Sequence, residues 1–259
     1  MTSPAPGDRL QSDTAPPVTR VDGQGDGIAA TVSSRAGGYS VPPYDSLNLG
    51  FGVGDDEDAV LANRAALAMA CGLRATDLAW MRQVHGTNVS YVGAGSPGPA
   101  EPTDAMFTDV PGLALCVLVA DCVPVLLADP VARLVGAAHA GREGLAAGVV
   151  PALLGAMTAA GADPSRMRAF TGPAICGGCY EVPADMQARV AAAVPAAACR
   201  TTAGTAGLDV GAGVRAQLAD AGLTRIGTDG RCTKQAPDLF SYRGSGTTGR
   251  QAALIWLLP

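Results

Sequence analysis

The chain of 259 residues is long enough for one large domain or two small ones, and 48% of its residues are apolar while only 4% are aromatic. Alanine, valine and leucine must therefore fill its core. The formal net charge of -5 argues against the broad basic surface that binding to a phosphate backbone favours, so we expect no nucleic acid partner. A local arginine could still hold a small anion.

The sequence also bears on where the protein acts. Its N-terminus carries no basic, apolar and small-residue signal, and no apolar run reaches the roughly 18 residues of a membrane span. Its seven cysteines are expected to be mostly reduced. We therefore expect a cytoplasmic protein without a membrane partner. The sequence leaves open whether it is a monomer or a homodimer.

The first 25 residues differ in composition from the rest of the chain. Residues 1–25 are rich in Pro, Ser, Thr, Asp and Gly, which predicts a mostly disordered tail that begins to order near Val18. No other break marks a domain boundary, so residues 26–259 are expected to form a single domain. After a strand and a long Gly/Pro-rich loop, an acidic first turn and the stop at Gly72 predict a helix over 55–72. Its packed face is expected to carry Val60, Leu61, Leu67 and Ala68.

The centre of the chain is its most strand-like part. The runs 113–120, 123–129 and 133–141 are continuously apolar, which is typical of strands covered on both faces. Asp129 and Pro130 predict a turn that makes the last two runs antiparallel. Helices are expected over 142–161, with Pro151 as a kink or break, and over 183–194 and 209–221, before a final strand at 250–258. This mixture without strict alternation favours a layered sandwich over a barrel.

Three residues carry the chemistry that the sequence suggests. His85, Cys122 and His139 each lie at the edge of an apolar run, beside glycine or a turn, and the chain has only two histidines. Two imidazoles and a thiolate form a reasonable ligand set for zinc with an open fourth position. Two other interpretations fit the same residues. They could be buried core side chains, or Cys122 could be a nucleophile with His139 as its base.

Other polar residues are candidates for contact with a substrate. Gln83 lies two positions before His85, so on a strand both side chains would face the same side. Arg64 could bind phosphate through two parallel N–H groups of its guanidinium, although an arginine on a helix is more often solvated or salt-bridged. Asn48 completes the substrate-binding set. Asp121 is a candidate proton shuttle, although neighbours on a strand point to opposite sides.

Two glycine-rich segments allow more than one interpretation. The CGGC stretch at 176–179 has the spacing of a redox pair or half of a zinc ribbon, but no second CxxC exists, and we expect a tight structural loop. The segment FSYRGSGTTGRQ at 240–251 fits a simple hairpin turn better than an anion-binding loop, because it lacks a strand-to-helix context.

Six ordered stretches resemble one family, the YfiH-like proteins, which are also labelled polyphenol oxidase, laccase-domain protein and peptidoglycan editing factor. The stretches are SLNLGFGVGDDEDAVLANRAAL, QVHGTNV, TDAMFTDVPGLALCVLVADCVPVLLAD, GAAHAG, GPAICGGCYEV and DLFSYRGSGTTGRQAALIWL. The resemblance runs from about residue 30 to the C-terminus. It implies a four-layer α/β/β/α sandwich with mixed sheets, an α+β or α/β fold.

The resemblance also implies a site and an activity. The family places a catalytic zinc on the histidine of QxHG, the cysteine of ADC and the histidine of HAG, which correspond to His85, Cys122 and His139. The implied activity is a purine nucleoside phosphorylase that acts on adenosine, inosine, guanosine and methylthioadenosine with phosphate, and also deaminates adenosine. Two departures stand out. Arg142 and Glu143 replace a Trp-Arg pair after HAG, and Gly178 separates two cysteines that are commonly adjacent.

Two alternatives follow from the family's other labels. One is an amidase that edits peptidoglycan precursors, using either Cys122 and His139 or the zinc ion. The other is a polyphenol oxidase with a single copper ion, Cu²⁺, in the same three-residue site. A multicopper oxidase is excluded, because two histidines cannot supply both a blue-copper centre and a histidine-rich trinuclear cluster.

Overall fold

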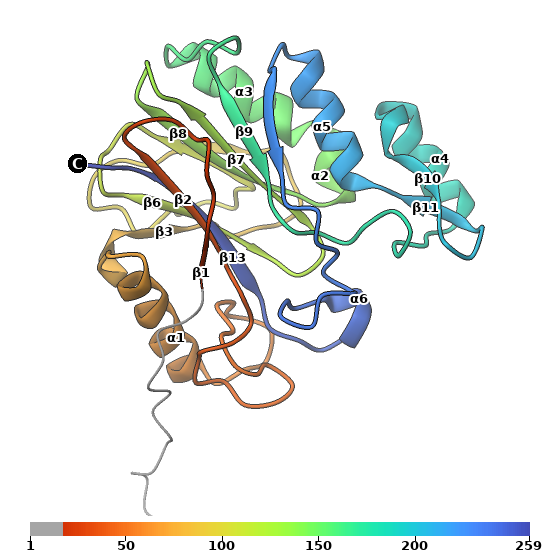
Figure 1. Cartoon of the computed structure of the whole chain (residues 1–259), viewed down its shortest axis with the longest axis horizontal. Helices are drawn as coiled ribbons and strands as arrows, with labels where there is room; N and C mark the ends of the chain where they lie inside the picture. Colours follow the sequence, from red (N-terminus) through yellow and green to blue (C-terminus); the bar gives the residue numbers. More distant parts are fainter. Residues whose placement is uncertain (1–17) are drawn as a thin grey trace, which may run out of the picture.

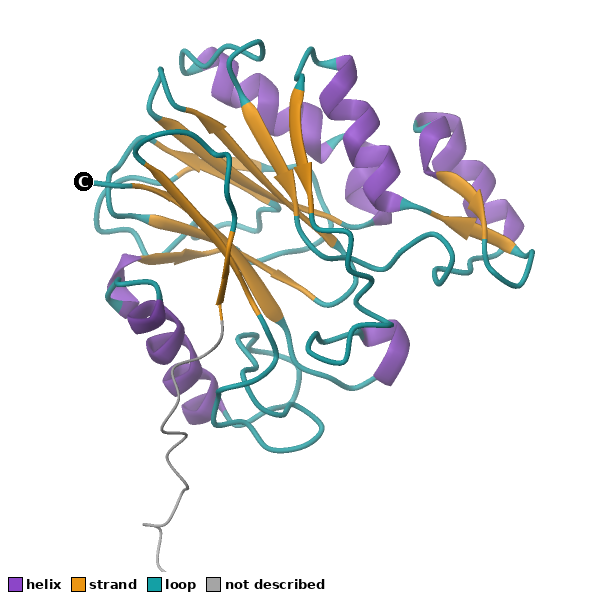
Figure 2. Ribbon diagram, in the orientation of Figure 1, coloured by secondary structure: helices purple, strands orange, loops and turns teal. Residues whose placement is uncertain are grey.

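Two β-sheets pack face to face in the computed structural model, which describes residues 18–259, and helices cover both outer faces (Figures 1 and 2). The first sheet has the order β1 (Val18–Arg20), β2 (Ile28–Ser33), β13 (Gln251–Leu257), β6 (Ala114–Val119) and β3 (Leu78–Trp80). The second has the order β12 (Arg225–Thr228), β9 (Arg168–Thr171), β7 (Val123–Asp129), β8 (Leu134–Ala140), β5 (Ala105–Thr108) and β4 (Val89–Tyr91). Each sheet mixes parallel and antiparallel pairs.

The helices divide between the two sheets. Helix α1 (Glu57–Ala70) packs on the first sheet, and α2 (Arg142–Ala147), α3 (Val149–Ala159) and α5 (Val210–Asp220) lie on the side of the second (Figure 1). Helix α4 (Ala184–Ala193) lies beside the small β10–β11 hairpin (Ala198–Arg200 and Ala206–Leu208). Among residues 18–259, no helix is both long and apolar enough to cross a bilayer.

Three apolar layers hold this arrangement together, one between the sheets and one under each set of helices. Alternate residues of β7 contribute to two of them, because successive side chains of a strand point to opposite faces. Val125 and Leu127 face the helices, whereas Leu126 and Ala128 face the first sheet. The continuous apolar runs therefore do mark strands covered on both faces, and the predicted four-layer α/β/β/α sandwich is confirmed.

The antiparallel pair β7–β8 has the predicted turn, with Val123 opposite Ala140 and Asp129 opposite Leu134. The expected helix over 142–161 is instead two helices, and the break lies at Gly148, whose φ of 91° belongs to the left-handed region. Pro151 falls in the first turn of α3, where no intrahelical N–H donor is needed.

Two other expectations need comment. Leu61 was predicted on the packed face of α1, but its side chain is 55% exposed, because it points away from the face that Val60, Leu67 and Ala68 bury. Most of the predicted tail, residues 1–17, lies outside the described residues. Val18–Arg20, near which order was expected to begin, pairs with Thr31–Ser33 of β2 as strand β1.

Candidate metal centre and cavity

The three predicted ligand residues meet where the chain passes between the sheets. His85 lies on the connection from β3 of the first sheet to β4 of the second, and Cys122 lies on the connection from β6 to β7. His139 lies near the end of β8. The ligand atoms of all three lie within 4.8 Å of one another, with Cys122 Sγ 3.8 Å from His85 Nε2. The sequence separated these residues widely, and the fold brings them together.

A buried carboxylate, Asp104, sets the positions of both histidines. Its oxygens accept the backbone N–H groups of Val84 at 3.0 Å, His85 at 2.9 Å and Gly86 at 2.7 Å. One of these oxygens also pairs with Nδ1 of His139 at 2.8 Å. This contact leaves Nε2 of His139 as the ligand nitrogen. The same three N–H groups support His85 at a φ of 62°, a left-handed conformation that is uncommon outside glycine.

The environment also favours the thiolate that a metal requires. Burial by itself would raise the pKa of Cys122, but hydrogen bonds and charge from His139 and His85 outweigh it and lower the pKa to about 6. Burial would lower the pKa of His139, whereas its contacts with Asp104 and Cys122 raise it to about 9. In the metal-free protein these two residues therefore favour a thiolate and imidazolium pair.

The three residues fit a zinc ion. Sulfur and nitrogen ligands of a tetrahedral zinc lie about 3.5 Å apart, which the 3.8 Å between Cys122 Sγ and His85 Nε2 approaches. Gly141 makes this approach possible, since a Cβ there would lie 2.7 Å from His85 Cδ2 and 3.1 Å from Cys122 Sγ. With three protein ligands, one coordination position stays open for a reacting molecule.

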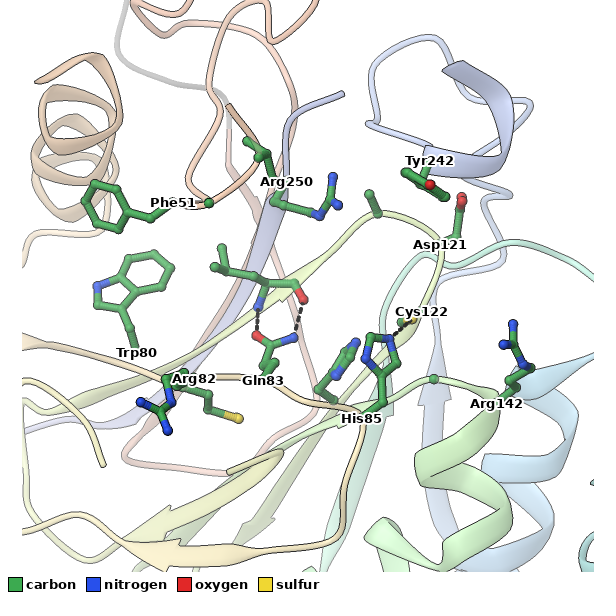
Figure 3. A pocket seen from close by; sticks show the side chains of 18 of the residues that line it. Phe51, Trp80, Arg82, Gln83, His85, Asp121, Cys122, Arg142, Tyr242 and Arg250 are labelled. Atoms are coloured by element: carbon green, nitrogen blue, oxygen red, sulfur yellow. Dashed lines mark hydrogen bonds between the residues drawn. The ribbon is translucent and has the colours of Figure 1, made fainter. Parts of the chain in front are cut away.

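A cavity of about 840 Å³ opens beside this group, within the range of small-molecule sites. Figure 3 shows Phe51 and Trp80 at one end, Arg142 at the other, and His85 with Cys122 between them. Five of the residues that the structure places around the cavity are arginines: Arg64, Arg82, Arg142, Arg243 and Arg250. Asp121 is the only carboxylate among these lining residues. The cavity is thus positively charged in a chain with a net charge of -5.

Four of the arginines have identified partners, and for Arg243 the partner is the Tyr180 ring, whose centre lies 4.9 Å from its guanidinium. The Arg64 guanidinium lies 3.9 Å from the ring centre of Trp80 and 4.4 Å from that of Phe51, and burial lowers its pKa to about 10. Arg250 donates to the carbonyl oxygens of residues 248 and 249, and burial lowers its pKa. Arg142 donates to the Tyr180 hydroxyl at 3.0 Å.

The expected substrate-binding residues have different positions. Arg64 and Gln83 line the cavity. The amide of Gln83 also bonds both backbone groups of Leu118, at 2.8 and 2.9 Å, and so fastens the His85 segment to β6. Asn48 is buried outside the cavity lining, and its Oδ1 accepts the N–H of Arg250 at 2.9 Å. Asn48 therefore positions an arginine that lines the cavity.

Asp121 lies on the cavity wall, where its carboxylate anchors a distant segment. It accepts hydrogen bonds from the hydroxyls of Thr233 and Ser241, at 2.6 and 2.7 Å, and from the backbone N–H of Arg243 at 2.6 Å. With both oxygens engaged, Asp121 is better placed to hold this wall than to carry protons. The predicted hairpin at 240–251 is wrong, because Tyr242–Ser245 forms the short helix α6, capped by Ser241, before β13.

Sequence reasoning missed Asp104 and Arg250. Asp104 directly precedes a buried strand, the same position at the edge of an apolar run that singled out the three ligand residues. Applying that criterion to carboxylates would have found it. Arg250 directly precedes the last strand, but an arginine at a strand end is common and gives no comparable signal.

The fold and the site define an α+β sandwich protein with an open group of two histidines and one cysteine beside an arginine-lined cavity. A family model described as multi-copper polyphenol oxidoreductase laccase matches residues 29–258. The chain belongs to this laccase-like, or YfiH-like, family, as its sequence resemblance implied.

Relatives and solved structures agree with this assignment. A purine nucleoside phosphorylase of Streptomyces coelicolor is 53% identical over 226 residues, which cover 87% of this chain and 93% of that protein. Purine nucleoside phosphorylase YfiH of Escherichia coli is 39% identical over 235 residues, 90% of this chain and 95% of that protein. The crystal structure of YlmD from Geobacillus stearothermophilus superposes with a TM-score of 0.83 at 32% identity, covering 90% of this chain and 93% of that one.

Proposed function

We propose that this protein is a metal-dependent purine nucleoside phosphorylase that holds zinc on His85, Cys122 and His139. Relatives that align over most of the chain carry the name purine nucleoside phosphorylase. The observation that carries the proposal is the gathering of five arginines around a cavity that also exposes the three ligand residues. A phosphate and a neutral nucleoside are the substrates that such a cavity suits.

The chemistry places clear demands on the cavity. A phosphate oxygen attacks C1′ of the sugar as the bond from C1′ to the purine nitrogen breaks, and the purine leaves with the bonding electrons. The products are the free base and a sugar 1-phosphate. The site must therefore hold a phosphate anion close to a sugar that develops positive charge, and it must keep competing water away.

Two arginines are best placed to bind the phosphate. Within residues 18–259, Arg142 is the one cavity arginine that forms an ion pair with a carboxylate, that of Glu143, so Arg243 and Arg250 are among those available to an anion. Arg250 lines the same cavity as His85, Cys122 and Asp121 (Figure 3). The charges of Cys122 and Asp121 partly offset the lowering of the Arg250 pKa by burial. We assign phosphate to Arg250 and Arg243, and the nucleoside to the part of the cavity that extends toward Trp80 and Phe51.

The bound metal would supply Lewis acidity at the open coordination position. Copper, to which the family description points, is the alternative ion for the same ligand set. Asp104 binds Nδ1 of His139, so Nε2 would be the nitrogen that holds the ion. We expect adenosine, inosine, guanosine and methylthioadenosine as substrates, together with adenosine deamination, in the reducing cytoplasm that suits seven thiols.

Inosine is the substrate that tests the proposal. Purified zinc-loaded protein should release hypoxanthine and ribose 1-phosphate from inosine only when phosphate is present. The Cys122→Ala variant should lose this activity, while Cys199→Ser, which alters a half-buried cysteine outside the cavity lining, should retain it. Release of hypoxanthine that does not depend on phosphate, or no release at all, would contradict the proposal.

One geometric observation favours a second function. Cys122, His139 and Asp104 form a thiol, imidazole and carboxylate series, the arrangement of a cysteine hydrolase. The second candidate is therefore an amidase that removes an amino acid from a peptidoglycan precursor. Incubation with a muramyl-amino acid separates the two functions. Cleavage of its amide bond by protein that is inactive on inosine would favour the amidase.

A further inference from the structure

A second group of thiols lies apart from the three predicted ligands. The sulfur atoms of Cys176, Cys179 and Cys232 lie within 4.8 Å of one another. Cys176 and Cys179 flank a tight turn in which the N–H groups of Cys179 and Tyr180 both donate to the Cys176 carbonyl at 3.0 Å. Cys232 comes from a different segment, which a β-bridge between Ala174 and Cys232 holds alongside the turn.

The two glycines of the turn are there for steric reasons. A Cβ on Gly177 would lie 2.7 Å from Cys199 Sγ, and a Cβ on Gly178 would lie 3.2 Å from Thr202 Cγ2. Side chains at these positions would push the turn outward. The small residues thus let both cysteines of the CGGC stretch face Cys232.

The hydrogen bonding also fits thiolates. The N–H of Cys176 donates to Cys232 Sγ at 3.3 Å. Burial by itself would raise the pKa of Cys232, but N–H groups of Cys176 and Lys234 and the neighbouring thiols lower it. Burial and the adjacent thiols raise the pKa of Cys179 to about 11. Three neighbouring thiols cannot all lose their protons unless a cation lies between them, because the negative charges of the thiolates repel one another.

We propose that Cys176, Cys179 and Cys232 form a second zinc site with three thiolate ligands. Sulfur ligands of a tetrahedral zinc lie about 3.8 Å apart, which three sulfur atoms within 4.8 Å of one another can reach with small side-chain adjustments. Thiolates select soft ions such as zinc over magnesium or calcium. Within the described part of the chain, no fourth histidine, cysteine or carboxylate joins the group, so water is the fourth ligand.

Positively charged residues near the three cysteines can balance the negative charge of a zinc centre with three thiolate ligands. Zinc with three thiolates carries a net charge of -1, and Lys234 lies two residues after the ligand Cys232. Cys179, Lys234 and Arg243 all line a smaller cavity of about 590 Å³. This cavity gives solvent, and hence the water ligand, access to the group.

The second site would stabilise one wall of the larger, arginine-lined cavity. Ile175, next to Cys176, donates its N–H to the Asp121 carbonyl at 2.9 Å, and Thr233, next to Cys232, donates its hydroxyl to the Asp121 carboxylate at 2.6 Å. Asp121 directly precedes Cys122. An ion on the three thiols would thus join the two segments that flank Asp121, without contact with the substrate.

The experiment is done in a Cys122→Ala background, which disables the first site and makes the result independent of the proposed function. Reduced, chelator-treated protein is titrated with Zn²⁺ and, separately, with Co²⁺. We expect one ion per chain, a sulfur-to-cobalt charge-transfer band in the near ultraviolet, and a rise in melting temperature with Zn²⁺. Adding Cys232→Ser should abolish all three, whereas adding Cys199→Ser, a cysteine close to the group but outside it, should change none.

Circular dichroism verifies that each variant is folded, and Cys179→Ser, at the rim of the smaller cavity, replaces Cys232→Ser should the latter not fold. Failure of Cys122→Ala protein to bind one ion per chain would overturn the proposal. So would binding that survives loss of Cys232 or Cys179. A disulfide among the three cysteines, found by mass spectrometry in protein that binds no metal after reduction, would assign them to redox chemistry instead.

Discussion

Asp104 and His139 are joined by a 2.8 Å hydrogen bond between Oδ1 and Nδ1, and the same carboxylate accepts the backbone N–H of His85 at 2.9 Å. A single buried side chain therefore fixes two candidate ligands that come from different strands and loops. Substitution of outer groups of this kind typically lowers metal affinity or activity by about 10- to 100-fold.

Asp104→Asn tests this role. The asparagine would direct an NH₂ group at backbone N–H donors and remove the charge that holds His139, so we expect zinc affinity to fall about 10- to 100-fold. Competition with a chromophoric chelator measures the change. Asp109→Asn makes the same substitution at a surface residue, whose carboxylate accepts a hydrogen bond from the Tyr91 hydroxyl, and should leave affinity unchanged. Equal affinities in the two variants would show that Asp104 does not support the site.

The reactivity of Cys122 should follow its lowered pKa. Below about pH 6 the thiol is protonated and unreactive, and above it the thiolate forms, so the rate of alkylation in metal-free protein should rise through about pH 6. Burial raises the pKa of Cys71 to about 11, so that residue should stay unreactive over the same range. Peptide mapping with iodoacetamide follows both residues. His139→Asn should move the Cys122 inflection upward, and an unchanged inflection would refute the pairing.

Gly141→Ala should weaken metal binding at the His85 and Cys122 ligands. The new Cβ would lie 2.7 Å from His85 Cδ2 and 3.1 Å from Cys122 Sγ, so one or both ligands must move. The backbone at Gly141 has a φ of -82°, which alanine adopts without strain, so stability should change little. Gly155→Ala in α3, where a Cβ meets nothing within 4 Å, is the matched control. Zinc titration and thermal unfolding of both variants separate loss of the site from loss of the fold.

Arg250→Gln should raise the KM for phosphate by about 10- to 100-fold, as expected when a charged hydrogen bond of about 1.5–3 kcal/mol is lost. The KM for inosine should change much less, because we assign the nucleoside to another part of the cavity. Arg200→Gln, which alters an exposed arginine bonded to the Gly204 carbonyl, serves as control. Steady-state kinetics with each substrate varied in turn give both constants. A larger effect on inosine than on phosphate would reverse our assignment.

Local patterns were enough to predict much of this molecule. The apolar runs identified β6, β7 and β8, and the turn at Asp129 gave the pairing of the last two. The runs could not show that β6 and β7 belong to different sheets, because a strand covered on both faces has the same pattern in either. The family resemblance supplied the layered architecture that periodicity alone left open.

The candidate site was predictable only in part. The two histidines of the chain and Cys122 could be predicted as ligands, because all three lie at the edges of apolar runs. The position of Asp104 before a strand could have marked it as a candidate. Its role, however, depends on hydrogen bonds from Val84, His85 and Gly86, which are distant in the sequence and which no local pattern predicts. Asn48 was expected to contact substrate because it is polar, yet it is buried and holds Arg250, since loop packing rather than polarity decides its neighbours.

The passage of the chain between sheets has a mechanical consequence. His85 and Cys122 lie on connections that leave the first sheet, and His139 belongs to the second, so a bound ion would cross-link the two halves of the sandwich. Ion binding and sheet spacing are then thermodynamically linked. A cavity-forming substitution in the layer between the sheets, at the buried Leu126 for example, would alter metal affinity from inside the core without touching a single ligand.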